Sequence, residues 1–253
     1  MINFLKKIVE IIVPSSKQLF LRFLTYKILG KVDNEIIYAD KILKRKHRFL
    51  DIGSNVGIYS YFFSKKFKKL ESFEPIEEIT YRLSALKLKN INLHHVALSN
   101  KKNNSKFYIP IKNGKLIPPL ASLEKGPKPY EIRIVKVKKL DDFNFKNVDL
   151  IKIDVEGHEE KLIIGAIKTI KKNLPIIICE IEKRHTLVPI NKIFRLIENL
   201  GYKGFFFKNN KLNSLKQFSF KHDQKPYLND VENKNYINNF IFTPHSKKKD
   251  CDK

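Results

Sequence analysis

The 253-residue chain has only two cysteines, and its N-terminal segment contains no apolar run long enough to cross a membrane. Cys179 and Cys251 lie far apart, so they provide neither a disulfide framework nor a zinc cluster. A reducing compartment is the simpler expectation, and we assign the chain to the cytoplasm. Charges interrupt the N-terminal segment before it reaches the roughly 18 apolar residues of a transmembrane helix. No small-residue cleavage site marks a signal peptide.

The same N-terminal segment has the pattern of an amphipathic helix. One face is predicted to carry Phe4, Ile8, Ile11 and Ile12, and the charged residues Lys6, Lys7 and Glu10 lie elsewhere. We expect this helix to pack against the rest of the chain. Peripheral contact with a membrane surface is the alternative.

Acidic residues are scarce relative to basic ones. The chain has 50 Lys and Arg against 26 Asp and Glu, a formal charge of +24. Such an excess favours anionic partners such as nucleic acid, acidic glycans or membrane lipid. The lysines, however, are spread in short groups such as residues 44–46 and 65–66. We therefore prefer a compositional explanation to a dedicated groove for a polyanion.

The three glycines of a dinucleotide-binding loop are also missing. Residues 49–58 pass from an apolar strand pattern through Gly53 and Gly57 into the start of a helix. A hydride-transferring enzyme would have glycine at 53, 55 and 58, and this chain has only the first. The loop begins with Asp51, which would repel a phosphate but could accept a hydrogen bond from an ammonium group. This favours a zwitterionic ligand such as S-adenosylmethionine.

Alternating strand and helix patterns predict an α/β fold with a doubly wound sheet. Expected strands are 49–53, 69–74, 91–98, 148–154, 174–181, 202–207 and 236–242; expected helices are the first ~30 residues, 35–44, 76–89, 158–172 and 190–200, with a further helix starting near 56. The second strand ends at Glu74, where βαβ nucleotide sites place an acid that binds the ribose diol. Between extended pieces at 106–111 and 131–138, residues 112–130 form a long loop. We predict that this loop is a mobile lid on the acceptor side.

Four short segments resemble one known family. They are residues 51–57 (Asp-Ile-Gly-Ser-Asn-Val-Gly), 73–75 (Phe-Glu-Pro), 97–99 (Ala-Leu-Ser) and, most specifically, 149–159 (Asp-Leu-Ile-Lys-Ile-Asp-Val-Glu-Gly-His-Glu). With these segments the chain resembles the FkbM-type SAM-dependent methyltransferases over about residues 49–207. The resemblance implies a Rossmann-like, seven-stranded sheet with the last strand antiparallel. It also implies methyl transfer from S-adenosylmethionine to a hydroxyl, often on a sugar or natural product.

The resemblance also implies a cofactor site, and the sequence patterns indicate a domain organisation. The predicted cofactor-binding residues are Asp51, Gly53, Ser54, Asn55, Gly57, Glu74, Ala97 and Leu98. Within this set the 53–57 loop holds the methionine end, Glu74 binds the ribose, and residues 97–98 lie beside the adenine. We expect an N-terminal helical segment (1–46), a methyltransferase domain (47–245) and a basic, disordered tail (246–253).

Three residues after the fourth predicted strand are candidate catalytic groups. Asp154 ends that strand, where open α/β sheets present reactive groups, and Glu156 and His158 follow at alternate positions. The structural alternative is that Glu156 or His158 caps the next helix. A divalent metal held by the three is not preferred, because no further ligand spacing is present. Glu180, Glu182 and His185 could serve the acceptor, although surface positions are the commoner explanation for such residues.

The acceptor follows from what the fourth strand lacks. Enzymes that methylate amines of nucleic acids typically carry a Pro-Pro-aromatic element there, and residues 154–157 read Asp-Val-Glu-Gly instead. This favours a hydroxyl acceptor over nucleic acid. Together with the resemblance, it leads us to predict an O-methyltransferase acting on a sugar, glycan or related metabolite, including anionic ones. The rival prediction is a basic protein on the same fold that binds nucleic acid or anionic glycan, or an RNA methyltransferase.

Overall fold

The computed structural model describes residues 13–30, 32–186 and 188–245. The predicted apolar face formed by Phe4, Ile8, Ile11 and Ile12, together with Cys251 and the predicted tail 246–253, lies outside these residues. In the described part of the chain, no helix is both long and apolar enough to cross a membrane.

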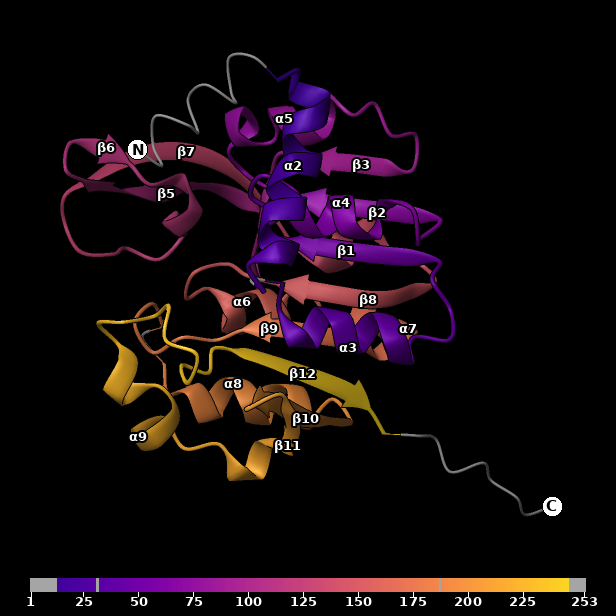
Figure 1. Ribbon diagram of the computed structural model, residues 1–253, viewed down its shortest axis with the longest axis vertical. Coiled ribbons are helices and arrows are strands. Elements are labelled where there is room, and N and C mark those ends of the chain that lie inside the picture. Colours follow the sequence, from indigo (N-terminus) through magenta and orange to yellow (C-terminus); the bar gives the residue numbers. More distant parts are fainter. Residues whose placement is uncertain (1–12, 31, 187, 246–253) are drawn as a thin grey trace.

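The centre of the described chain is a mixed sheet of eight strands in the order β11-β10-β12-β9-β8-β1-β2-β3 (Figure 1). The strands are β1 (Arg48–Ile52), β2 (Lys69–Phe73), β3 (Ile91–His94), β8 (Val148–Ile153), β9 (Ile176–Glu180), β10 (Tyr202–Lys208), β11 (Lys211–Ser214) and β12 (Asn239–Pro244). Strands β3, β2, β1, β8 and β9 pair in parallel, and β12 inserts antiparallel between β9 and β10. The predicted doubly wound fold with an antiparallel last strand is confirmed.

The predicted strand count of seven is wrong, because β10 turns back on itself. Asn209 and Asn210 both adopt left-handed φ values, +52° and +58°, between the paired residues Lys208 and Lys211. Two such residues form the tight turn that matches the twist of a β-hairpin. The turn adds β11 as an eighth strand at the edge of the sheet.

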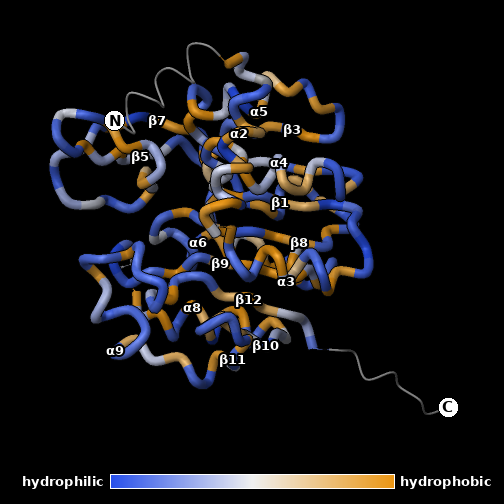
Figure 2. The backbone as a smooth tube through the Cα atoms, in the orientation of Figure 1, coloured by the Kyte–Doolittle hydropathy of each residue, from blue (hydrophilic) through white to orange (hydrophobic). Residues whose placement is uncertain are grey.

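Helices cover both faces of the sheet, as a parallel sheet requires. Helices α3 (Asn34–Ile42) and α4 (Ile58–Ser64) pack on one face, and α6 (Glu159–Ile164), α7 (Ile167–Asn173) and α8 (Ile190–Glu198) pack on the other. Neighbouring residues of β8 divide between the two cores, with Leu150 in the first and Ile151 in the second. Hydrophobic residues accordingly concentrate along the strands and the helices facing them (Figure 2). Helix α2 (Ser15–Ile28) packs outside, against α4 and the short α5 (Tyr81–Ser84).

Two predicted helices are shorter than expected. The helix predicted at 76–89 is only a 3-10 turn (Glu77–Ile79) followed by α5, and Lys87 beyond it has a left-handed φ of +49°. The helix predicted at 158–172 divides into α6 and α7. The division occurs because the Asp141 carboxylate accepts hydrogen bonds from the backbone of Lys168 (3.0 Å) and Thr169 (2.8 Å) and so caps a new helix start.

The strand predicted at 91–98 is also divided. Only β3 belongs to the main sheet, and β4 (Ala97–Leu98) joins a second sheet of order β4-β7-β5-β6 with β5 (Asn103–Lys112), β6 (Lys115–Leu116) and β7 (Tyr130–Lys138). Figure 1 shows β1 and β8 pointing toward the side from which β5 and β7 project, and β12 pointing the opposite way. The second sheet therefore stands at the carboxyl ends of the parallel strands. A short helix, α9 (Phe220–Asp223), precedes β12.

Candidate functional site

A cavity of about 570 Å³, counting its open mouth, lies where the parallel strands end beneath the second sheet. Its lining residues are Ile52, Gly53, Asn55, Phe73, Glu74, Pro75, Val96, Ala97, Leu98, Phe107, Pro118, Pro119, Ala121, Leu123, Asp154, Val155, Glu156 and His158. Eight of the eleven predicted site residues are in this set. The other three, Asp51, Ser54 and Gly57, are not among these lining residues.

The β1–α4 loop is held against the end of β8. Gly53 has a φ of +77°, and a Cβ built on it would lie 1.7 Å from the carbonyl oxygen of Asp154. The backbone N–H of Asp154 donates to the carbonyl of Ile52 at 3.0 Å. Glycine is therefore required at 53 by the approach of another backbone segment. Gly57 has a φ of +84° and packs against Leu83.

The Asp51 carboxylate binds the first turn of helix α4. One carboxylate oxygen accepts hydrogen bonds from the backbone N–H of Ser60 (3.0 Å) and from its hydroxyl (2.7 Å). Burial raises the pKa of Asp51, whose side chain is almost fully enclosed. Its second oxygen Oδ1 and the hydroxyl of Ser54 are buried without a hydrogen-bond partner among the described residues. Buried polar atoms of this kind usually have hydrogen-bond partners, so Asp51 Oδ1 and the Ser54 hydroxyl could each form a hydrogen bond with a ligand at this loop.

Glu74 lies in the cavity wall with both carboxylate oxygens fixed by backbone. Oε2 accepts from the N–H of Asn55 at 3.1 Å, and Oε1 accepts from the N–H of Ile76 at 3.0 Å. Each oxygen retains a lone pair for a ligand hydroxyl. Burial raises the pKa of Glu74 to about 7. Ala97 and Leu98 are buried on the apolar wall nearby.

Asp154 is paired with a buried lysine that the sequence analysis did not assign to the site. The Lys152 ammonium lies 2.8 Å from Asp154 Oδ2; the lysine side chain is 3% exposed and the aspartate side chain 27%. Burial lowers the pKa of Lys152, but the carboxylates of Asp154 and Glu180 outweigh this effect and hold it above its usual range. The ammonium also lies 4.9 Å from the centre of the Tyr59 ring. The signal was a single lysine inside the apolar run of residues 148–153.

Glu156 has the opposite electrostatic environment. Burial and the neighbouring carboxylates of Asp154 and Glu182 raise its pKa well above the usual value. Its Oε2 lies 3.1 Å from Nε2 of His185, a side chain whose pKa burial lowers. Glu156 has a left-handed φ of +53°, so the turn after β8 is strained at this residue. Glu156 is thus favoured in its neutral, hydrogen-bond-donating form.

The surface positions preferred for Glu180, Glu182 and His185 are wrong. Glu182 is 5% exposed, and its carboxylate accepts a hydrogen bond from Asn238 at 2.8 Å. The same amide donates to Glu180 at 2.8 Å, and burial raises the pKa of Glu180 well above its usual value. Asn238 thus joins a buried acid, Glu182, to a partly buried one, Glu180.

His158 has both ring nitrogens engaged. Nδ1 lies 2.7 Å from Glu124 Oε1, and Nε2 lies 2.9 Å from the hydroxyl of Ser99. The hydrogen bond from His158, reinforced by Lys161, lowers the pKa of Glu124 to about 2 although burial opposes it. His158 is the N-cap residue of α6, but its side chain makes no capping hydrogen bond. Its contacts instead join the β8–α6 turn to the second sheet.

The segment predicted as a lid, residues 112–130, carries structure of its own. It contains β6 and a 3-10 turn (Pro118–Leu120), whose prolines line the cavity. Ser122 exchanges backbone hydrogen bonds with Tyr108, and its hydroxyl donates to the carbonyl of Val155 at 3.2 Å. Ser122 and Glu124 therefore attach the segment to the β8–α6 turn, and its mobility stays a prediction. Over the described residues, no three His, Cys, Asp or Glu side chains are grouped as metal ligands.

Comparison with known proteins gives one family. The family described as Methyltransferase FkbM domain matches residues 51–203. No curated protein matches the chain.

Several solved structures are similar. The FkbM methyltransferase of Methylobacillus flagellatus is 13% identical with a TM-score of 0.46, over 78% of this chain and 43% of that one. A TehB-like SAM-dependent methyltransferase of Corynebacterium glutamicum is 13% identical with a TM-score of 0.47, over 90% and 97%. An rRNA methylase of Streptococcus thermophilus is 11% identical with a TM-score of 0.43, over 82% and 90%. The chain thus spans less than half the length of the FkbM structure that it matches.

Proposed function

The chain belongs to the FkbM methyltransferase family, and from this premise we propose that it transfers the methyl group of S-adenosylmethionine to a hydroxyl of a sugar, glycan or related metabolite. The predicted family and cofactor are confirmed by the match to this methyltransferase domain. The hydroxyl acceptor is our inference from the site. It rests on the titratable side chains that line the cavity and on their hydrogen bonds.

The residues present fit the cofactor. The cavity opens at the carboxyl ends of the parallel strands, where open α/β sheets bind their ligands. Glu74 would accept from the ribose hydroxyls, and Ala97 and Leu98 would contact the adenine. The unpartnered oxygens of Asp51 and Ser54 would be available to the amino-acid end. When bound, S-adenosylmethionine supplies a methyl group already activated on a sulfonium.

The Lys152–Asp154 pair is the observation that carries the proposal. The Lys152 ammonium lies 2.8 Å from Asp154 Oδ2, and the partial exposure of Asp154 lets an acceptor reach it. A carboxylate there orients the acceptor hydroxyl and takes its proton. A strong base is unnecessary, because the hydroxyl proton becomes very acidic as its oxygen forms the new bond to carbon. Asp154 can therefore act as the base while paired with a cation.

The other two candidates suit different tasks. Glu156, kept neutral by burial and by its acidic neighbours, would donate a hydrogen bond to an acceptor oxygen. His158 has no ring nitrogen left for a substrate proton, because Glu124 and Ser99 occupy both. We therefore propose Asp154 as the catalytic base and His158 as a positioning residue for the cavity wall.

The test begins with labelled S-adenosylmethionine and a cell lysate separated into glycan, small-metabolite, lipid and RNA fractions. We expect label in the glycan or small-metabolite fraction, as a methyl ether that survives alkaline hydrolysis. With the acceptor found, Asp154→Asn should reduce turnover roughly a hundred- to ten-thousand-fold. Its affinity for S-adenosylmethionine should change little.

Glu160→Gln is the matched control. Glu160 is a nearby acid paired with Lys192 on the surface and is outside the described cavity lining, so turnover should be retained. Near-normal turnover in Asp154→Asn together with inactive Glu156→Gln would move the base to Glu156. Label found in RNA, or released as methanol by alkali, would contradict a sugar hydroxyl as the acceptor.

A further inference from the structure

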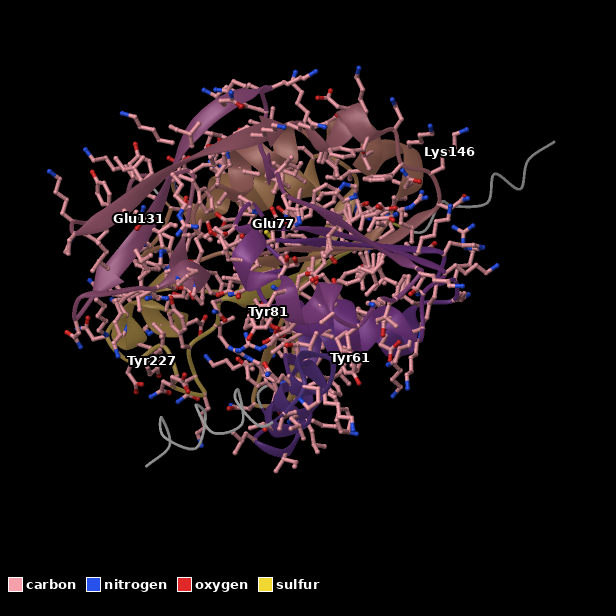
Figure 3. The ribbon with its side chains drawn as sticks, turned by 90° about the horizontal axis from the view of Figure 1, so that it is seen from above. Tyr61, Glu77, Tyr81, Glu131, Lys146 and Tyr227 are labelled. Carbon is pink, nitrogen blue, oxygen red and sulfur yellow. The ribbon has the colours of Figure 1, made fainter. Side chains whose placement is uncertain are left out.

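Helix α2 has apolar side chains on two opposite faces. Its inner face is buried: Leu19 has no exposed surface, and the Phe23 ring lies 5.7 Å from the ring of Tyr61 on α4. Figure 3 shows Tyr61 and Tyr81 of the neighbouring elements beside the indigo helix. The outer face is formed by Phe20, Leu24 and Ile28, which are 47%, 38% and 74% exposed. We call these three residues the outer stripe.

The outer stripe is continuous because its members are four residues apart and therefore share one side of the helix. Leu29, 61% exposed, extends the apolar surface at the end of α2. A row of exposed aromatic and aliphatic side chains on an amphipathic helix is costly to leave in water and marks an interaction surface. The inner face already anchors α2 to the domain, so the stripe is available without unfolding.

The charged residues of α2 itself are all of one sign. Residues 13–30 contain no acid. The exposed Lys17 and Lys27 lie three residues before Phe20 and three after Leu24, so they border the stripe on the same side. The next acids along the described chain are Asp33 and Glu35. Asp33 accepts a hydrogen bond from the Tyr59 hydroxyl, and Glu35 is buried.

This combination selects the partner. A second copy of the chain would bring lysines against lysines, on a protein that already carries a formal charge of +24. An anionic bilayer offers apolar depth to the stripe and negative headgroups to the bordering lysines. We propose that α2 binds the surface of anionic phospholipid membranes through Phe20, Leu24 and Ile28. This binding is independent of the methyl acceptor.

The absence of tryptophan from the chain makes a direct test available. In the full chain, Phe20→Trp places a single tryptophan in the stripe. Its emission should shift to the blue with vesicles of phosphatidylcholine and phosphatidylglycerol, and not with phosphatidylcholine alone. The control is Ile134→Trp. Ile134 is 66% exposed and belongs to β7 of the second sheet, which projects away from α2 (Figures 1 and 3). The emission of this variant should stay constant.

A second measurement uses sedimentation with the same vesicles. The double variant Leu24→Glu/Ile28→Glu should lose binding by roughly tenfold or more, whereas Ile132→Glu/Ile134→Glu on β7 should bind as the native chain does. Circular dichroism checks that the helix content is unchanged. The proposal is overturned if the native chain does not bind anionic vesicles or if the stripe variant binds equally well. A lipid-free dimer that the stripe variant dissociates would also overturn it, by assigning the face to a second copy.

Discussion

Replacing the buried ammonium of Lys152 by the isosteric apolar side chain of methionine tests the electrostatics of the site. The ammonium lies 2.8 Å from Asp154, is almost fully enclosed, and also compensates the charges of Asp33, Asp51 and Glu180. Removing one partner of a buried ion pair leaves an uncompensated charge and typically costs about 3 to 5 kcal/mol. Because Asp154 is 27% exposed and water can reach it, we expect the lower end, about 3 kcal/mol at neutral pH.

The cost should depend on pH in a defined direction. Burial raises the pKa of Asp33 and of Asp51, and Lys152 opposes that rise. Without Lys152 the folded-state pKa values rise further, while the unfolded values stay near 4. An acid with a raised folded-state pKa destabilises the fold as the pH increases from its unfolded pKa to its folded one. The loss in Lys152→Met should therefore be small near pH 4 and grow as the pH rises above the unfolded-state pKa values.

Urea unfolding of both proteins at several pH values measures this difference in the free energy of unfolding. The matched control is Lys192→Met, which breaks a pair of similar length, 2.7 Å to Glu160, with a lysine that is 61% exposed. A surface pair contributes about 0 to 1 kcal/mol, so the control should be nearly neutral. Equal losses in the two variants, or a Lys152→Met loss that is constant with pH, would refute the electrostatic account of the site.

Two further predictions concern Glu74 and Glu124. Glu74→Ala should weaken S-adenosylmethionine binding by about 1.5 to 3 kcal/mol, the range for hydrogen bonds to a charged group. Calorimetry measures this affinity, and the control Glu78→Ala, at an exposed neighbouring residue, should bind as the native chain does. Equal affinity in the two variants would show that Glu74 does not bind the cofactor. The hydrogen bond from His158 lowers the pKa of Glu124 to about 2. Ionised Glu124 therefore stabilises the fold at pH values above its usual pKa, and this stabilisation is lost as the pH falls toward the lowered pKa. Glu124→Gln should therefore cost about 1 kcal/mol near pH 7, after allowance for solvent screening, and progressively less toward pH 3 in thermal unfolding; a difference independent of pH would contradict the charged hydrogen bond.

The sequence predicted the fold well because local and long-range signals agree in the sheet. Strands β1, β8 and β9 are buried on both faces and read as continuous apolar runs between polar turns. The predictions were wrong where single polar residues start a new element or form a turn. The Asn209–Asn210 turn adds a strand, and the distant Asp141 carboxylate starts α7 in the middle of a helical pattern. A pattern of apolar residues cannot reveal a cap supplied by a residue 28 positions away.

The candidate site was predictable where one side chain lies at one strand end. Glu74 and Asp154 follow buried strands, and the fold brings them to one cavity. The pairing of Lys152 with Asp154 is local, because residues two apart along a strand share a face, but the burial of Lys152 depends on strands from elsewhere in the chain. The reason for Gly53 was also hidden, since the backbone that excludes a side chain there is about 100 residues further along the chain.

Net charge proved a poor guide to the cavity, and this bears on the acceptor. A formal charge of +24 favours anionic ligands, yet the described cavity lining contains Glu74, Asp154 and Glu156 and no lysine or arginine. An anionic group entering this space would meet like charge at Asp154 and, among the described lining residues, neither lysine nor arginine. A neutral polyol meets acceptors and a donor that match its hydroxyls. If the natural acceptor carries an acidic group, that group should therefore stay outside the cavity, and removing it should raise KM while leaving kcat unchanged.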